Sequence, residues 1–503
     1  MGAQSVDTAM LRGRLGPTAL ALIVGSAAGA CVVLLAAKTS PLLALGAVGA
    51  LLLFVILARL PVLGLYACAL VVPLERMGRF TDDASRYTIS LMRIVGVLAL
   101  AAMLAHMLVR RTRLQFGRAF WLYCGYTALA FLTVFYSTDF HGTVRACGAI
   151  LGNLMFFFVV INLASSRRVA ETAVALWLSV SVAVGLYTTY DWHFGALIGT
   201  RIGEFDPGRG EQSAENRLST VWEDRSEWDE LSGTARAMGP TSHSAVYGIN
   251  LILTMPFFFY FLRGEKRPWL KALLLLGLAV IGYNVMLTNT RAAILLAGVV
   301  LGIALLWRLV ELSAPRLFLG AVGLIAILAL VPGDVWQRVL DLSNYTIDRS
   351  ATLRIRLAYW DAALLAVQDH WLTGMGVGNQ EAVARYMTEP GPEETTAHCE
   401  YLQTAMEVGI LGWALFFGFV FLLLATAFRA GRRFAQPPPL DRDFWFMRAC
   451  QLAMIAVLLY GIQLDVFHFP LKGWWLAAGL VVAMEQLSRR AVDQPFLRPL
   501  VPT

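Results

Sequence analysis

His398 is the residue of this chain whose type and setting point most directly to chemistry. It lies in the stretch 395–412, which closes a long polar segment and leads into an apolar segment over 413–428. An imidazole with an ordinary pKa of about 6.5 can accept a proton from a substrate hydroxyl near neutral pH. A satisfied structural histidine at a membrane interface is the alternative, and the sequence leaves it open.

A helix is predicted to carry His398. The three- and four-residue spacing of His398, Leu402, Ala405 and Gly409 places them on one side of it. Gly409 would let neighbouring backbones approach closely where the helix enters the membrane. The thiol of Cys399 would then point about 100° away from His398, so it is poorly placed for activation as a nucleophile, and a packing role is predicted.

Four arginines near the ends of apolar segments could bind an anion: Arg236, Arg291, Arg354 and Arg356. A guanidinium keeps its charge and offers paired donors to phosphate oxygens, and each charge-assisted bond contributes roughly 1.5–3 kcal/mol. Two or three such bonds would stabilise a diphosphate leaving group about as a divalent metal does. The alternatives are an arginine that snorkels to the interface at Arg291 and a solvated helix face at Arg354 and Arg356.

Acidic residues suggest weaker sites. Glu75 and Glu400 are candidate substrate-binding residues by position, and a structural cap is the alternative for Glu75. The Asp-Arg-Asp motif at 441–443 is expected in a solvated loop. The Asp-Asp pair at 82–83 could hold Mg²⁺ with waters but has no third acidic ligand nearby. The three alternate glycines at 372–379 could cradle a phosphate, although a turn is favoured. No metal and no cofactor is therefore predicted.

Composition shows which elements must position these residues. Of the 503 residues 58% are hydrophobic and 15% charged, and the mean hydropathy is +0.63. These values are typical of a polytopic membrane protein and exclude an ordinary soluble domain. The six cysteines lie mostly in apolar segments and form no CxxC motif, so neither a disulfide framework nor a zinc site is indicated.

The predicted fold is all-α, with about 14 transmembrane helices (12 to 14) in one membrane domain over 1–503. Two outer loops are expected at 191–240 and 333–408, and the second contains helices, one of them an amphipathic helix over 352–368 with Leu357, Trp360, Leu364 and Val367 on one face. The predicted spans are 17–37, 42–58, 60–74, 92–109, 119–136, 144–163, 172–190, 243–262, 270–288, 292–310, 315–332, 409–428, 448–466 and 470–487.

The distribution of charge predicts the orientation. Basic loops at 110–118, 263–271 and 429–433 fall on one side only if both termini are cytoplasmic. Segments assigned to the inside then carry a surplus of Lys and Arg, and those assigned to the outside a surplus of Asp and Glu. The net charge of +7 therefore reflects membrane topology, and binding of nucleic acid is not needed to explain it.

Three motifs resemble the superfamily of O-antigen ligases and Wzy-type polymerases from about residue 73 onward. His398 and Cys399 are followed by nine residues and then by Gly-Ile-Leu-Gly at 409–412. Arg291 begins an Arg-x-x-x-Leu motif, and Arg356 precedes Trp360 and the Trp-Leu-Thr-Gly-Met-Gly turn at 371–376. Cys399 departs from the family pattern, which usually has Asn, Ser or Gln there.

The resemblance implies a metal-independent, inverting, GT-C-like glycosyltransferase in the bacterial inner membrane, with its active site on the periplasmic side. The donor would be a glycan on undecaprenyl diphosphate. Arg291 and Arg356 would bind the departing diphosphate, and His398 would orient or deprotonate the acceptor hydroxyl. Arg354, Arg236, Glu75 and Glu400 are not part of these motifs and are predicted to contribute to substrate binding from their positions.

Three functions fit this resemblance. A polymerase of exopolysaccharide or O-antigen repeat units is slightly favoured, because the acidic 191–240 loop suggests a sugar-binding surface. A ligase that passes the glycan to lipid A-core or another acceptor has the same signature. A transporter of lipid-linked oligosaccharide would need charges within several spans. Expected partners are the lipid-linked donor, a glycan acceptor and membrane lipids, with a flippase and a chain-length regulator as further partners.

Overall fold

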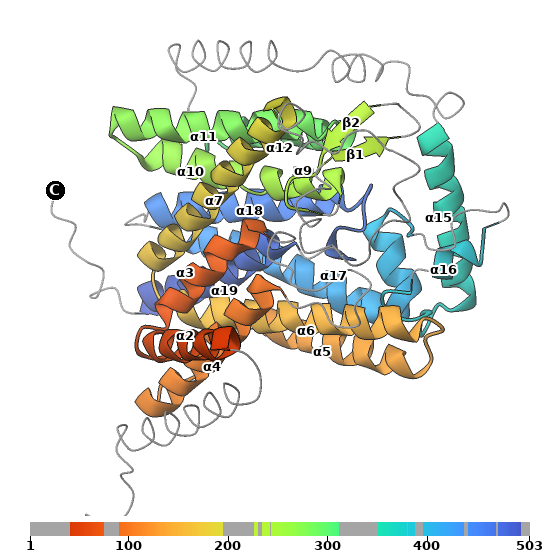
Figure 1. Ribbon diagram of the computed structural model, residues 1–503, viewed down its shortest axis with the longest axis horizontal. Coiled ribbons are helices and arrows are strands. Elements are labelled where there is room, and N and C mark those ends of the chain that lie inside the picture. Colours follow the sequence, from red (N-terminus) through yellow and green to blue (C-terminus); the bar gives the residue numbers. More distant parts are fainter. Residues whose placement is uncertain are drawn as a thin grey trace, which may run out of the picture. The chain divides into compact units, whose positions relative to one another are not determined.

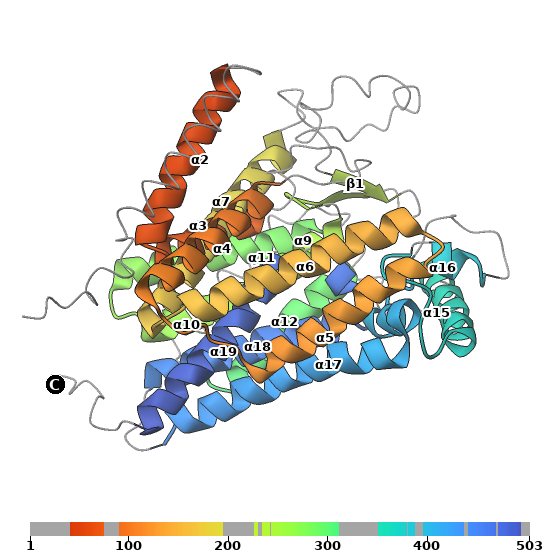
Figure 2. The ribbon, with the colours of Figure 1, turned by 90° about the horizontal axis from the view of Figure 1, so that it is seen from below.

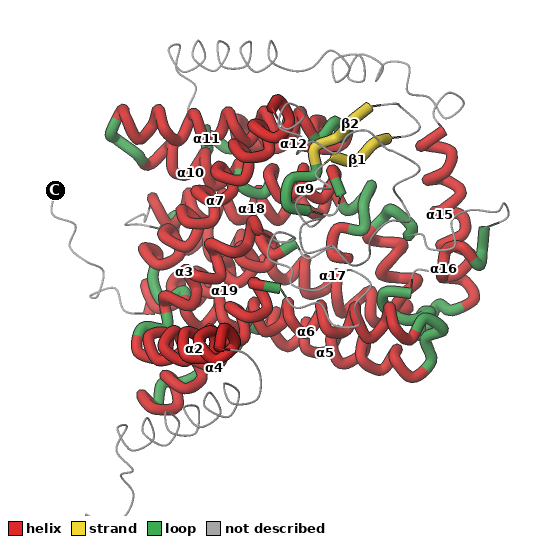
Figure 3. Tube along the Cα trace, viewed as in Figure 1, coloured by secondary structure: helices red, strands yellow, loops and turns green. Residues whose placement is uncertain are grey.

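The computed structural model describes residues 41–74, 90–194, 226–229, 234–241, 243–310, 351–379, 381–387, 396–436, 441–468 and 471–493. These residues are mostly helical (Figure 3), as the sequence predicts. They form two compact units, Met1–Gly64 with Val97–Leu114, and Leu65–Gly96 with Gln115–Thr503. The prediction of one membrane domain over the whole chain stays a prediction.

The first unit contains α2 (Pro41–Arg59) and most of α4 (Leu91–Arg110). Residues 62–64 of α3 (Val62–Val71) also belong to it. The Nδ1 atom of His106 in α4 lies 2.8 Å from the carbonyl oxygen of Ala58 in α2. This contact joins the ends of the two helices within the unit.

The second unit contains the remaining helices and one strand pair (Figure 1). Its elements are η2 (Val72–Leu74), α5 (Arg118–Leu132), η3 (Thr133–Phe135), α6 (Phe140–Leu163), α7 (Arg167–Phe194), β1 (Ser226–Asp229), β2 (Thr234–Ala237), α9 (Ser244–Ile252), α10 (Met255–Gly264), α11 (Pro268–Leu287), α12 (Arg291–Leu306), α15 (Ala351–Asp369), α16 (Glu381–Ala384), α17 (Glu400–Phe434), α18 (Asp441–Tyr460), η5 (Val466–His468) and α19 (Lys472–Asp493).

Eight helices in the described part of the chain are long and apolar enough to cross a membrane. They coincide with predicted spans, although α9 and α10 together make one of them, Ser244–Gly264. The helix α12 and the helical segment Val62–Leu74 are apolar but shorter. The predicted spans 17–37 and 315–332 lie outside the described residues, so the count of fourteen stays a prediction.

An aromatic core holds α5, α6, α17 and α19 together, and Figure 2 shows α5, α6 and α17 lying side by side. The ring of Trp475 stacks on Phe419 with centroids 5.8 Å apart, and Tyr123 lies 4.9 Å from Phe419. All three side chains are buried. Dispersion between large rings supplies the packing that keeps these helices together in a lipid environment.

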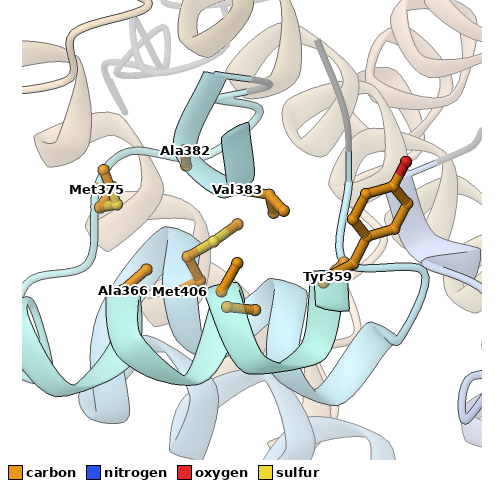
Figure 4. Packing of buried hydrophobic residues seen from close by; sticks show 9 residues of the cluster. Tyr359, Ala366, Met375, Ala382, Val383 and Met406 are labelled. Atoms are coloured by element: carbon orange, nitrogen blue, oxygen red, sulfur yellow. The ribbon is translucent and has the colours of Figure 1, made fainter. Parts of the chain in front are cut away.

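The helix α15 crosses the end of this bundle beside α16 (Figures 1 and 2). Its buried face consists of Tyr359, Ala362, Ala363 and Ala366, which pack with Met375, Val383 and Met406 around the start of α17 (Figure 4). The sequence correctly predicts the helix but not its face: Leu364 is exposed, and Leu357 and Trp360 are only half-buried. Small alanines let α15 lie close to α17.

The Asp-Arg-Asp motif at 441–443 is not in a solvated loop, which corrects that expectation. It forms the first turn of α18, where acidic residues complement the helix dipole. Asp443 is buried and accepts a 2.9 Å hydrogen bond from Arg167 at the start of α7. The helix begins seven residues before the predicted span, at 441 instead of 448.

The outer loop predicted at 191–240 also contains regular structure. The helix α7 continues to Phe194, and β1 and β2 form an antiparallel pair in which Glu227 is opposite Arg236. Ala237 packs against Tyr283 and Leu287 of α11. This strand pair is an addition to the predicted all-α fold.

Candidate active site

Several candidate site residues come close to the segment between α18 and α19. The helix α18 ends at Tyr460, a turn follows, and Asp465 precedes the short helix η5. The backbone amide of Glu400 donates to the carbonyl of Gly461 over 2.8 Å, and the hydroxyl of Tyr401 donates to Leu458 over 2.8 Å. The start of α17 is therefore bound to the end of α18.

His398 lies beside this segment but not on a helix, which corrects the prediction. The helix α17 begins at Glu400 with Cys399 as its N-cap, and His398 adopts a φ of 48°. This left-handed conformation is unfavourable for most non-glycine residues, and such strain is often found at functional sites. Its Nδ1 atom lies 3.7 Å from the Oδ1 atom of Asp465.

His398 is partly exposed to solvent, whereas Asp465 is buried. The side chain of His398 is 34% exposed, whereas that of Asp465 is 1% exposed. At 3.7 Å the two atoms are too far apart for a direct hydrogen bond. The distance does suit an ion pair with a protonated imidazole, so the carboxylate is placed to stabilise the charge that His398 gains when it accepts a proton.

A polar network fixes the backbone around His398. The amide of Ala397 donates to the Oε1 atom of Gln403 over 2.8 Å, and the Nε2 atom of Gln403 donates to Glu407 over 2.8 Å. The ring of Tyr359 packs beside the imidazole with centroids 5.8 Å apart. Buried, hydrogen-bonded neighbours of this kind hold a strained residue in place.

Glu400 joins α17 to the convergent segment. Its buried carboxylate accepts a 2.8 Å hydrogen bond from the amide of Phe467 and a 2.9 Å hydrogen bond from the hydroxyl of Thr404. The oxygen bonded to Phe467 therefore helps to position the segment that carries Asp465, while the other oxygen is bonded within α17. The prediction that Glu400 binds substrate stays a prediction.

Arg356 reaches the same segment from α15. Its Nη1 atom donates to the Oε1 atom of Gln463 over 3.2 Å. Because Gln463 is two residues before Asp465, the structure brings Arg356 and His398 to one short stretch of chain. Arg354 is exposed on α15 and shares this end of the protein.

A series of contacts connects the region of Arg291 to the end of α18 that precedes Gln463 and Asp465. Arg291 is half-buried at the first turn of α12, directly after Thr290, whose hydroxyl lies 3.5 Å from Ser244 at the start of α9. The hydroxyl of Tyr460, at the end of α18, donates to Ala245 over 3.0 Å. Arg236 lies half-buried in β2, which contacts α9 and α11, and Glu75 is outside the described residues.

Two features that could have suggested other chemistry have structural roles. Cys399 is buried, and burial raises the pKa of its thiol, which disfavours the thiolate that a nucleophile needs. Gly374, Gly376 and Gly378 all have positive φ, and the amides of Met375 and Gly376 donate to the carbonyls of Met406 and Glu407. The favoured interpretation of this loop as a turn is therefore correct, because two of its amides already serve α17.

Asp465 and Gln463 are the site residues that the sequence prediction missed. Both fall at the end of the predicted span 448–466, whose apolar composition predicts a membrane helix there. The available signal was an acidic side chain within a membrane span, which is costly unless it has a function. In the described part of the chain, no group of three or more His, Cys, Asp or Glu residues could hold a metal ion.

Comparison with protein families found a match over part of the chain. Residues 272–417 match the family model for O-antigen ligases, Wzy_C. The match confirms the resemblance to that superfamily, and it includes Arg291, Arg356 and His398 but ends before Asp465. No curated protein sequence matches the chain.

The family match and the apolar helices together indicate an integral membrane protein with a role in glycan transfer during assembly of surface polysaccharide. Activity of a glycosyltransferase type, with lipid-linked glycan substrates, is what the O-antigen ligase family implies.

Proposed function

We propose that this protein is a metal-independent, inverting glycosyltransferase that takes a glycan from undecaprenyl diphosphate at the periplasmic face of the bacterial inner membrane. The observation that carries the proposal is the convergence of His398 and Arg356 on residues 463–465. A proton acceptor and a fixed cation beside one another are what an acceptor hydroxyl and a diphosphate leaving group require.

The proposed reaction is a single displacement at the anomeric carbon of the donor. The acceptor hydroxyl oxygen forms the new bond to this carbon while the bond to the diphosphate oxygen breaks, and the electron pair leaves with the diphosphate. The hydroxyl proton passes to His398, and Asp465 stabilises the resulting imidazolium. Attack opposite the leaving group inverts the configuration.

Arginine provides the stabilisation of the leaving group. Negative charge on the diphosphate grows as the bond breaks, and Arg356, held by Gln463, meets it with a preorganised guanidinium. Arg291 at the start of α12 supplies a second positive charge, with Arg354 and Arg236 as further contacts. Two or three charge-assisted bonds of roughly 1.5–3 kcal/mol each replace the contribution of a metal.

Within this proposal, polymerisation of exopolysaccharide or O-antigen repeat units is slightly favoured, because the acidic 191–240 segment suggests a sugar-binding surface. Transfer to lipid A-core is the alternative, and it agrees with the description of the matching family as O-antigen ligase. Both use the same donor chemistry and differ in the acceptor. A flippase would deliver the donor, and a chain-length regulator would act with a polymerase.

The experiment that tests the proposal replaces His398 by Ala in the intact protein. Transfer from a lipid-linked donor in proteoliposomes is expected to fall to the background rate, with protein level and donor binding nearly unchanged. Full activity of His398→Ala would exclude this mechanism. In cells, loss of a polymerase leaves single repeats on the lipid carrier, whereas loss of a ligase leaves long lipid-linked chains.

A further inference from the structure

An uncharged, exposed apolar surface lies at the end of α5 beside the first turns of α17. We name it the boundary patch. Its side chains are 44% to 86% exposed and come from the α5–α6 turn, the loop after α15 and the bend in α17: Leu132, Phe135, Tyr136, Phe140, Trp371, Leu372, Ile410 and Leu411.

Hydrogen bonds join these three segments, although they are far apart in sequence. The hydroxyl of Tyr136 donates to the carbonyl of Thr373 over 2.5 Å. The amide of Ile410 donates to the carbonyl of Trp371 over 2.8 Å. The boundary patch is therefore a built surface, held together by its own backbone contacts.

The bend of α17 at Gly409 allows the loop after α15 to lie close to this helix. Gly409 has a φ of 65°, and a Cβ atom there would collide with the carbonyl of Leu372. A Cβ atom at Gly376 would collide with Ser137 of the α5–α6 turn. Both glycines leave room for a neighbouring segment, so the loop cannot separate from the α5–α6 turn or from α17 without loss of these contacts.

The absence of charge in these segments indicates what covers the patch. Residues 131–138, 371–379 and 408–428 contain no Asp, Glu, Lys or Arg. Of the acids that flank these segments, Asp139 caps α6 through a 2.8 Å hydrogen bond from the amide of Gly142. Glu407 is buried, and Asp369 accepts a 3.0 Å hydrogen bond from the hydroxyl of Tyr386. Exposed large apolar side chains in segments that contain no Asp, Glu, Lys or Arg are costly in water but normal in lipid.

The patch also continues the exposed apolar surface of a candidate membrane span. The span Arg118–Phe135 ends within it, and the same helix exposes Trp121 and Phe131 along its length. Tryptophan and tyrosine are enriched where the acyl region meets the headgroups, because their rings are apolar with one polar group. Trp371 and Tyr136 provide that combination at the end of the span.

We infer that the boundary patch is inserted into the headgroup region of the bilayer and anchors the loop after α15 to the membrane. Residues 371–373 belong to the segment 333–408, which the sequence predicts to be a water-exposed loop, so part of that loop contacts lipid. Because Trp371 is hydrogen-bonded to Ile410 and α17 begins two residues after His398, the patch sets the depth of His398 relative to the lipid surface.

Fluorescence of the full-length protein in proteoliposomes tests this inference. The chain has 14 tryptophans, so the signal of one is obtained as the difference between the wild type and a Trp→Phe variant. Trp371→Phe isolates Trp371, and Trp121→Phe is the matched control, since these side chains are 59% and 61% exposed. The quenchers are acrylamide in water and phospholipids brominated near the headgroup.

The fluorescence of Trp371 is expected to be quenched at least about twofold more strongly by the brominated lipids than by acrylamide. The fluorescence of Trp121 is expected to show the same preference. Phe135→Trp supplies a second reporter on the other side of the patch, with the same expected result. Quenching of both reporters by acrylamide alone would overturn the inference. Protection from acrylamide in cell membranes but not in proteoliposomes would also overturn it, because a protein partner would then cover the patch.

Discussion

Asp465→Asn is the substitution that tests most directly how the site works. It removes the carboxylate charge that lies 3.7 Å from the imidazole of His398 and keeps the size of the side chain. In the proposed mechanism this charge matters only after His398 has accepted the proton from the acceptor. The substitution should therefore lower kcat and leave KM for the donor nearly unchanged.

The magnitude follows from the distance and the exposure. Two unit charges 3.7 Å apart attract by about 4.5 kcal/mol at an effective dielectric constant of about 20. The imidazole is one-third exposed, and solvent screening reduces this to about 2 kcal/mol. At 1.36 kcal/mol per factor of ten, kcat should fall by about 30-fold.

The assay is glycan transfer in proteoliposomes at saturating donor, with thermal unfolding measured on the same preparation. Asp443→Asn is the matched control, since Asp443 is also a buried aspartate next to a basic side chain, but at the opposite end of α18. Its loss should lower stability without a comparable loss of kcat. An unchanged kcat in Asp465→Asn, or an equal loss in both variants, would refute the reasoning.

Three further outcomes are expected. Arg356→Lys and Arg291→Lys should each lower the transfer rate by roughly 10- to 100-fold, because an ammonium loses the paired geometry of a guanidinium; a rate within the error of the wild type would show that charge alone suffices. EDTA should leave the transfer rate nearly unchanged, and strong inhibition would favour a metal-dependent enzyme. Gly409→Ala should destabilise the protein by about 1–3 kcal/mol in thermal or denaturant unfolding, because φ is 65° and the Cβ atom would meet Leu372; Gly418→Ala, with open space around its Cβ position, should not.

Periodicity and composition were sufficient to predict most helices of the described chain. Long apolar segments such as 144–163 and 270–288 became α6 and α11 with ends within a few residues. Such segments have one stable solution in lipid, because every backbone polar group must be bonded within the helix. The type of element is therefore encoded locally.

The candidate site was predictable only in part, because its geometry depends on contacts between distant segments. His398 is identified by its residue type and context, but residue spacing wrongly predicts that it lies on a helix. Cys399 is the N-cap of α17, and the amide of Ala397 donates to Gln403, so His398 lies in a turn before the helix. Asp465 was hidden in an apolar run. Its closeness to His398 arises from the hydrogen bonds of Glu400 to residues 461 and 467, which no local pattern reveals.

The buried face of α15 was mispredicted for a related reason. Hydrophobicity favoured Leu364, yet the structure buries Ala362, Ala363 and Ala366 instead. Close approach to α17 requires small side chains, and a scale of hydrophobicity does not measure how near a partner helix lies.

The interruption of α17 at Gly409 has a consequence for how such sequences can diverge. The carbonyls of Met406 and Glu407 accept hydrogen bonds from the amides of Met375 and Gly376, so these two carbonyls keep backbone partners at the break in the helix. Insertion or deletion of a single residue between 371 and 376 would put these donors out of register with their acceptors. Among related chains, the length of this loop and the glycine in the helix should therefore be conserved together, whereas the other side chains of the loop and the helix can vary.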